Sequence, residues 1–136
     1  MEPEKRTDFT SLIESARLAR EHAYAPYSHF AVGAALRTKG GRVFTGCNVE
    51  NVSFGLTICA ERVALGAAVS AGERDFEALA VVADSKEPVT PCGACRQVLA
   101  EFSMTLAVCS ANLEGAVYES SIAELLPRPK EGILGA

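Results

Sequence analysis

Apolar side chains recur along the chain with two spacings, one typical of helices and one typical of strands. In residues 8–23 they follow the spacing of an amphipathic helix, with Thr7 or Asp8 as its cap. The apolar positions of this stretch are Phe9, Leu12, Ile13, Ala16 and Ala19. Residues 78–84 (ALAVVAD) and 105–110 (TLAVCS) are instead short apolar runs, as expected of strands that are covered on both faces.

The other segments show the same two patterns. Residues 30–38 and 42–49 are strand-like runs joined by a Lys-Gly-Gly stretch, which predicts a hairpin. Helices are expected over residues 59–72, where Gly72 ends the helix, and over residues 92–102. Because the second helix lies between two apolar strands, it predicts a parallel strand pair with a right-handed crossover.

Near the C-terminus, residues 115–120 are expected to form an edge strand and residues 121–126 a short last helix. The predicted order is α-β-β-α-β-α-β-β-α, without internal repeats or evident linkers. Helices on both faces of a mixed sheet of about five strands are the expected architecture, a three-layer α/β/α fold. We expect one domain spanning residues 1–136, which is long enough to bury its own core.

Composition narrows the classes of function. Apolar residues make up 49% of the chain and charged residues 22%, as in globular proteins. The net charge of −4 and the scattered lysines and arginines argue against nucleic-acid binding, which needs clustered cations. No apolar run could cross a bilayer, and the first twenty residues lack the apolar core of a secretory signal. We therefore expect a cytoplasmic protein with no membrane partner, whose five cysteines are thiols or metal ligands.

The stretch PCGACRQ carries two cysteines at the start of a predicted helix. Taken alone, Cys92 and Cys95 fit a thioredoxin-like redox pair as well as half of a metal site. The stretch ICAER favours the metal site, because it adds Cys59 and Glu61 at the start of the other long helix. Three cysteines with a nearby carboxylate predict a zinc site that keeps one coordination position for water, the arrangement of catalytic zinc. Two helix N-termini directed at the metal would also stabilise thiolates.

The charge of such a site calls for a nearby cation. Three thiolates around Zn²⁺ leave a charge of about −1, and a bound hydroxide makes it about −2. Arg62 directly follows Glu61, and Arg96 directly follows Cys95. We expect Arg62 to donate hydrogen bonds to the ligand thiolates, with Arg96 as a further candidate. The alternative for either arginine is a solvated position on its helix.

The spacing of these motifs matches a known family. C-x-E followed about thirty residues later by P-C-x-x-C is the signature of zinc-dependent nucleoside and nucleobase deaminases, with Cys here in place of the more familiar His. Together with APYSHFAVGAAL and GCNVEN, these stretches resemble the small cytidine deaminases that act on free nucleosides. The resemblance runs from about Ala23 to Pro127. It implies a cytidine deaminase-like fold and the hydrolysis of cytidine and deoxycytidine in pyrimidine salvage.

The resemblance also implies roles for individual residues. One zinc ion per chain would be held by Cys59, Cys92 and Cys95 and would activate water toward C4 of cytosine. Glu61 would take the proton of that water, deliver it to N3 of the ring and help to protonate the departing ammonia. Uridine or deoxyuridine and ammonia would be the products.

The same resemblance implies how the nucleoside is held. Asn48 and Glu50 alternate along a predicted strand and so share one face, and the family places them on the sugar hydroxyls, chiefly the 3′-OH. Phe30 would pack beside the base, and the backbone of Ala60 would contact its carbonyl and amide region. Further candidates for the pocket are Tyr27 and Phe54. A carboxylate near the ribose should favour cytidine over CMP.

Two features depart from the family. The tail LLPRPKEGILGA lacks the aromatic residue that, in many relatives, closes an active site across a subunit boundary. Phe54 stands where the family often has Tyr, so the preference among pyrimidine nucleosides could differ. The family's homotetramer is still the expected assembly.

Other interpretations stay open from the sequence. A deaminase of the blasticidin type resembles this chain around the zinc but generally lacks the NVEN stretch. A noncatalytic zinc module would need a fourth ligand from Cys47 or Cys109, which are otherwise expected in the core. The interpretation as a zinc module gives Glu61 no role, and the interpretation as a dithiol redox protein gives neither Glu61 nor Cys59 a role. A polynucleotide editor is disfavoured by the charge and by the lack of interleaved aromatic and basic residues. Neither His22 nor His29 is spaced to join the site.

Overall fold

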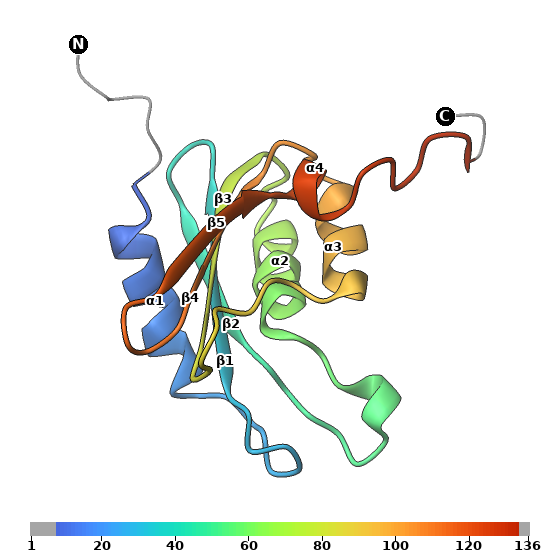
Figure 1. The fold of residues 1–136 in the computed structure, drawn as a ribbon. Helices are drawn as coiled ribbons and strands as arrows, with labels where there is room; N and C mark the ends of the chain where they lie inside the picture. Colours follow the sequence, from blue (N-terminus) through green and yellow to red (C-terminus); the bar gives the residue numbers. More distant parts are fainter. Residues whose placement is uncertain (1–7, 134–136) are drawn as a thin grey trace.

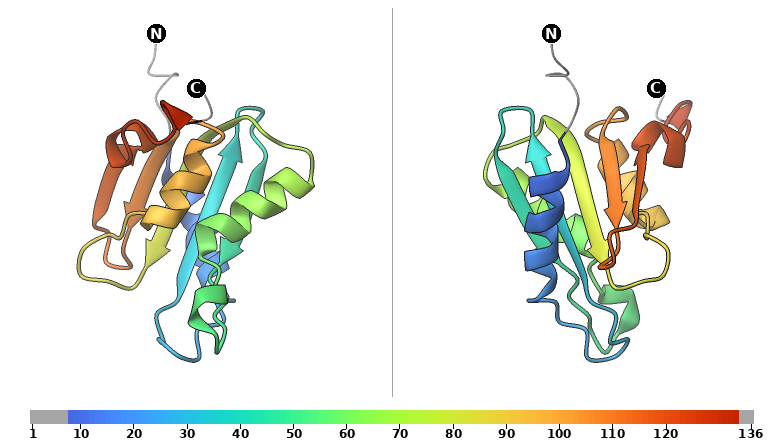
Figure 2. Two further views of the ribbon diagram at one scale, coloured as in Figure 1. Left: turned by 90° about the vertical axis from the view of Figure 1, so that its right-hand side faces the viewer. Right: turned by 60° about the vertical axis from the view of Figure 1, so that its left-hand side comes forward.

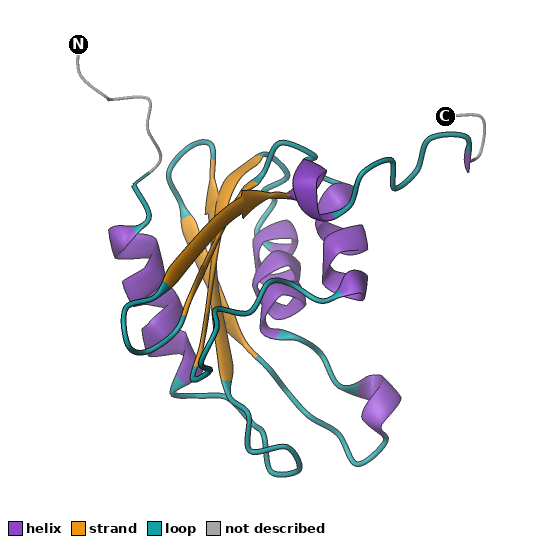
Figure 3. Ribbon diagram, viewed as in Figure 1, coloured by secondary structure: helices purple, strands orange, loops and turns teal. Residues whose placement is uncertain are grey.

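The computed structural model of the chain describes residues 8–133 (Figures 1 and 3). The strands of these residues are β1 (Val32–Thr38), β2 (Val43–Cys47), β3 (Phe76–Ala83), β4 (Ala107–Ala111) and β5 (Val117–Ser121). The helices are α1 (Thr10–Arg20), α2 (Ala60–Ser70), α3 (Gly93–Ala100) and α4 (Ile122–Leu125), with a 3₁₀ turn η1 (Phe54–Leu56). The predicted order of helices and strands is confirmed.

The strands form one mixed sheet in the order β2-β1-β3-β4-β5. Strand β1 pairs with β2 and β3 in antiparallel fashion, and β4 pairs with β5 in the same way. The expected parallel pair is β3 with β4, in which Ala78 lies opposite Ala107. Helix α3 joins these two strands, and β5 lies at the edge of the sheet, as predicted.

Helices cover both faces of the sheet (Figures 1 and 2). Helix α1 packs on one face, where Leu12 and Ala16 meet the small side chains of β1 and β3. Helices α2 and α3 lie on the other face, where Leu65 and Leu99 share a core with Leu79. Strand β3 sends alternate side chains to these two cores, which explains why residues 78–83 are apolar without interruption. The three-layer α/β/α architecture is therefore confirmed.

Two glycines allow the helices to lie directly on the strand backbone. A Cβ atom at Gly33 of β1 would lie 2.0 Å from the carbonyl oxygen of Ala16 in α1. A Cβ atom at Gly46 of β2 would lie 2.6 Å from both the carbonyl oxygen of Ala60 and the amide nitrogen of Ala64. Only glycine fits at such distances, so Gly46 fixes how closely the first turn of α2 approaches the sheet.

Some boundaries differ from the expectation. Strand β2 ends at Cys47 and not at residue 49, because the Asn48 side chain binds the backbone of residues 30 and 32. The turn η1 has no counterpart in the predicted order. The N-cap residue of α1 is Phe9 and not the expected Asp8, although Asp8 accepts a hydrogen bond from the amide of Thr10 at 3.0 Å. Thr7, the alternative cap, lies outside the described residues. Within residues 8–133, no helix combines the length and apolarity that crossing a bilayer requires.

Candidate metal and substrate site

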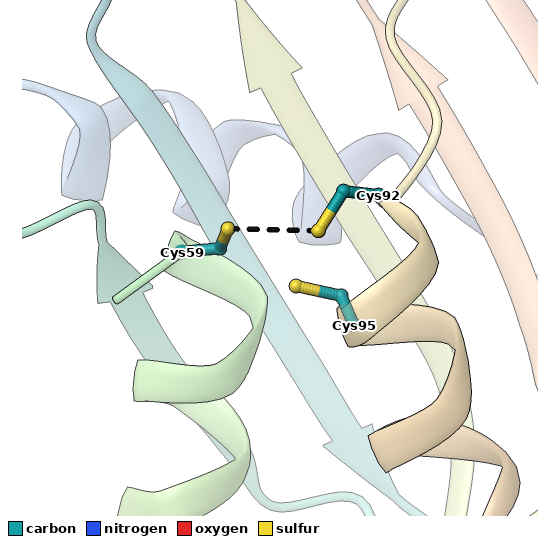
Figure 4. Close-up of side chains that lie close together, drawn as sticks. All are labelled: Cys59, Cys92 and Cys95. Carbon is teal, nitrogen blue, oxygen red and sulfur yellow. Dashed lines mark hydrogen bonds between the residues drawn. The ribbon is translucent and has the colours of Figure 1, made fainter. Parts of the chain in front are cut away.

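Three thiols meet where helices α2 and α3 begin (Figure 4). Cys59 and Cys92 are the N-cap residues of α2 and α3, and Cys95 lies in the first turn of α3. Both cap residues have extended backbone, and neither side chain caps its own helix. Their thiols therefore face a shared point, and the three sulfur atoms all lie within 4.8 Å of one another.

This arrangement fits zinc. A tetrahedral ion with Zn–S distances of about 2.3 Å places its sulfur ligands about 3.8 Å apart. The Sγ atoms of Cys59 and Cys92 are 3.8 Å apart. Among residues 8–133, no fourth His, Cys, Asp or Glu belongs to the cluster. Cys109 is buried in β4 and Cys47 ends β2, so the structure gives neither thiol a place among the ligands.

The thiols differ in acidity. The pKa of Cys59 is lowered to about 5, first by its hydrogen bond with Cys95 and then by the guanidinium of Arg62. The pKa of Cys95 is raised, because its thiol donates to the Cys59 sulfur and is buried beside Glu61. Cys59 is therefore the more acidic of these two thiols. Bound zinc would replace the protons of the thiols, as metal ions do at thiolate sites.

Arg62 lies against the first of these thiols. It is three residues after Cys59 on α2, a spacing that places two side chains on the same helix face. Its Nη2 atom lies 3.6 Å from the Cys59 sulfur. The thiol sulfurs of Cys59 and Cys95 raise the pKa of Arg62, so the cation is held there.

Replacing Arg62 with Ala should weaken zinc binding. The substitution leaves the thiolate charge without a compensating cation, and the loss of such a partner typically costs about 10- to 100-fold in metal affinity or activity. Zinc competition with a chelator, together with turnover, measures the effect. Arg17→Ala on the exposed face of α1 serves as the control. Unchanged zinc affinity and turnover in Arg62→Ala would remove this role.

The expectation for Arg96 is wrong. Its guanidinium binds the Thr90 hydroxyl and the carbonyl oxygens of Pro91 and Leu125, and no thiol. The side chain leaves α3 toward the preceding loop, where oxygen acceptors lie within reach. Oxygen is a stronger acceptor than sulfur, so these contacts prevail.

Glu61 lies in the first turn of α2, near the thiols of Cys59 and Cys95. Its side chain is buried, with 5% of the residue exposed. Burial raises the pKa of Glu61 to about 6, and the negative charge on Cys59 contributes in the same direction. A carboxyl group with this pKa can both accept and release a proton near neutral pH.

A cavity of about 290 Å³ opens beside the thiols. Its lining includes Cys59, Ala60 and Glu61 from the start of α2, and Cys92 from α3. Phe30, Asn48 and Glu50 line it too, so the structure brings the expected substrate-binding residues to one place. Cys95 is buried beside Cys59 and is not part of the lining.

Sequence reasoning missed several residues of this lining: Ser28, Val32, Thr57, Val89 and Thr90. All five lie within or directly before a stretch that the sequence singled out. Val89 and Thr90 precede the P-C-x-x-C motif, and Thr57 precedes ICAER. Ser28 and Val32 lie within the APYSHFAVGAAL stretch.

Asn48 and Glu50 also hold the loop that carries Phe30. The Asn48 side chain donates to the carbonyl of Phe30 at 2.8 Å and accepts from the amide of Val32 at 2.9 Å. Glu50 accepts from the amides of Tyr27 and Ser28 and from the Ser28 hydroxyl. The Ser28 hydroxyl and these amides lower the pKa of Glu50, so the carboxylate is ionised. Each side chain keeps further hydrogen-bonding capacity, and both residues line the cavity.

A second cavity of about 350 Å³ adjoins the first, and both are lined by Ser28, Glu50 and Thr57. Tyr27 and Phe54 also line the second cavity, and their rings meet edge to face with centroids 5.9 Å apart. The structure thus places these two candidates beside the thiol cavity and not in it. His29 lies in the turn that precedes Phe30, with a left-handed backbone at a φ of 59°.

Comparison with known proteins finds deaminases by family model, by sequence and by structure. Residues 6–111 match the family model described as the cytidine and deoxycytidylate deaminase zinc-binding region. A cytidine deaminase of Sporosarcina psychrophila is 53% identical over 121 residues, which cover 88% of this chain and 89% of that protein. A blasticidin-S deaminase of Bacillus cereus is 34% identical over 124 residues, which cover 85% and 87% of the two chains. The crystal structure of a cytidine deaminase from Burkholderia pseudomallei superimposes with a TM-score of 0.87 at 54% identity, covering 89% of this chain and 98% of the other.

Proposed function

Because the chain belongs to the cytidine and deoxycytidylate deaminase family, we propose that it hydrolyses cytidine and deoxycytidine to uridine and deoxyuridine with release of ammonia. The observation that carries the proposal is the meeting of three thiols with a buried carboxylate at one cavity. Cys59, Cys92 and Cys95 hold one zinc ion per chain, and Glu61 is the catalytic residue. We place the whole activity in a single domain that spans the chain.

Glu61 moves the protons of the reaction. When held by the three thiolates, zinc would supply Lewis-acid activation of a water molecule. Glu61 accepts the proton of the attacking water, passes it to N3 of the base and then helps to protonate the leaving ammonia. Such positioned proton transfer is typically worth about 10²- to 10⁴-fold in rate. The pKa of about 6 suits a group that must accept and release protons in turn.

The remaining residues orient the nucleoside. The ring of Phe30 packs beside the base, and the backbone of Ala60 contacts the carbonyl and amide side of the base. Asn48 and Glu50 bind the sugar hydroxyls, chiefly the 3′-OH, which cytidine and deoxycytidine share. An analogue without this hydroxyl would leave their polar atoms unpaired, which is the usual basis of strong discrimination.

CMP should be a poor substrate. Glu50 is ionised in the protein, and a phosphate on the nucleoside would add negative charge close to it. Like charges brought together at a binding site cost several kcal/mol, so we expect kcat/KM for CMP to be at least about 100-fold below that for cytidine. Glu50→Gln should narrow this gap while lowering activity on cytidine. Comparable kcat/KM values for the two substrates would refute the role of Glu50.

One experiment separates the leading functions. Zinc content is measured together with the absorbance change on adding cytidine, deoxycytidine, CMP or blasticidin S. We expect one zinc ion per chain and turnover of the two nucleosides. The similarity to the Bacillus cereus blasticidin-S deaminase makes that antibiotic the second candidate substrate. Turnover of blasticidin S with none of cytidine would assign the second function in place of the first.

We propose a homotetramer as the assembly and the cytoplasm as its location. An exposed apolar surface runs along the loop around η1 and supports association between copies. Its residues, with their exposed fractions, are Val49 (41%), Val52 (75%), Phe54 (73%), Leu56 (66%) and Ile58 (43%). Sedimentation equilibrium of the purified protein tests the assembly, and cell fractionation tests the location.

A further inference from the structure

We propose that Arg96 is a positioning residue for the wall of the thiol cavity formed by residues 88–91, and thereby for nucleoside binding. This inference rests on the proposed function, because it assigns the wall to the binding of that substrate. Arg96 does not touch the thiols, so its role differs from that of Arg62.

The half-buried guanidinium joins three separate groups. Its Nε atom donates to the carbonyl oxygen of Pro91 at 2.6 Å, and its Nη2 atom donates to the hydroxyl of Thr90 at 2.8 Å. Its Nη1 atom donates to the carbonyl oxygen of Leu125, the last residue of α4, at 3.0 Å. Helix α4 is fixed in turn by Ile122, which is buried in the core under α2 and α3.

The wall depends on these contacts. Residues 88–91 lie in the loop between β3 and α3, outside any strand or helix. Within the part of the chain that the structure describes, the only hydrogen bonds found to residues 88–91 come from Arg96. Val89 and Thr90 line the cavity, and Cys92 follows at once as a thiol of the cluster. Arg96 therefore connects a helix anchored in the core to a loop with no other polar support.

The choice of arginine fits this role. None of the ion pairs found among residues 8–133 involves Arg96, so its charge is balanced by the oxygen atoms of the wall and of α4. A planar guanidinium donates in several fixed directions at once, whereas a lysine ammonium lacks this fork. A lysine at this position would keep the charge but lose the simultaneous contacts.

The test compares Arg96→Met and Arg96→Lys with Arg37→Met. Arg37 is a matched control, because it is also partly buried, with 15% of its side chain exposed, and it pairs with Glu77 at 2.6 Å near the far end of β1. The readouts are KM and kcat for cytidine, zinc content, and NMR backbone order parameters of Val89 and Thr90. The order parameters report on the wall whether or not the protein turns over cytidine.

We expect KM for cytidine to rise roughly tenfold in Arg96→Met, the equivalent of one charge-assisted hydrogen bond, with a smaller change in kcat. The order parameters of Val89 and Thr90 should fall from about 0.85 to below about 0.6. Zinc should stay at one ion per chain. Arg96→Lys should restore only part of the lost affinity, and Arg37→Met should change neither KM nor the order parameters.

A second variant keeps the inference testable if Arg96→Met does not fold. Thr90→Val removes one acceptor of the guanidinium and should raise KM, whereas Thr90→Ser keeps the hydroxyl and should preserve KM. Unchanged KM or unchanged order parameters in the Arg96 variants would overturn the inference, as would an equal rise of KM in Arg37→Met. If the wild-type protein does not deaminate cytidine, the proposed function fails. In that case the order parameters decide whether Arg96 holds the wall.

Discussion

Glu61→Gln should abolish turnover of cytidine while zinc content and fold stay native. Glutamine has the shape of glutamate, so the buried site is filled as before. Its neutral amide cannot accept a proton from water or carry one to N3 and then to the leaving ammonia. Because one carboxylate serves all these transfers, we expect kcat to fall by at least about 10³-fold. The measurement is kcat at saturating cytidine, with zinc determined on the same sample.

Glu101→Gln is the matched control for this substitution. Glu101 is an exposed carboxylate at the end of α3 and should be replaceable without effect. Near-native turnover in a zinc-loaded Glu61→Gln protein would rule out Glu61 as the proton carrier. Loss of zinc from the variant would instead show that the carboxylate is needed to hold the metal.

Gly46→Ala should destroy the zinc site without touching a ligand. The new methyl group would lie 2.6 Å from two backbone atoms of α2, which can yield only if the first turn of the helix moves off the sheet. That turn begins at Cys59 and contains Glu61. Overpacking against backbone costs on the order of 3 kcal/mol or more, which corresponds to a fall of roughly 10 °C in Tm. Thermal unfolding and zinc content measure the two effects.

Substitutions of two other glycines serve as controls, because they distinguish loss of the zinc site from a general loss of stability. Gly40→Ala in the β1–β2 hairpin should be tolerated, because its Cβ atom would meet only the Thr38 hydroxyl at 3.8 Å. Gly33→Ala should lower Tm at least as much as Gly46→Ala, because its Cβ atom would meet α1 backbone at 2.0 Å. Helix α1 covers the face away from the thiols, so the folded fraction of Gly33→Ala should keep its zinc. Full zinc binding in Gly46→Ala would contradict the link between β2 and the site.

The fold could be predicted from the sequence because each element has one dominant signal. Strand β3 is apolar from Ala78 to Ala83, where both of its faces are covered, and Gly72 has the positive φ of 93° that a residue ending a helix often adopts. The end of β2 could not be predicted, because Asn48 leaves the ladder through side-chain contacts with a strand sixteen residues earlier. The turn η1 is three residues long and carries no periodic pattern.

The cluster of thiols could be predicted because all three cysteines lie at the first residues of helices, and the start of a helix can be recognised from the local sequence. The two arginines show the limit of such reasoning. Both follow a residue of the site directly in sequence, yet Arg62 reaches Cys59 whereas Arg96 reaches oxygen atoms of a loop and of α4. The acceptors of Arg96 are backbone carbonyls for the most part, and their position depends on the tertiary fold. Neither the composition nor the spacing of residues predicts these hydrogen-bond acceptors.

The position of the thiols has a consequence for the stability of the folded protein. Cys59 and Cys92 are 33 positions apart, and α2 and β3 lie between them. A metal held by both acts as a cross-link that closes this segment into a ring. By the chain entropy of a loop of this length, such a cross-link is worth roughly 3–4 kcal/mol. Depletion of the ion would therefore lower the free energy of unfolding as well as remove the reaction centre.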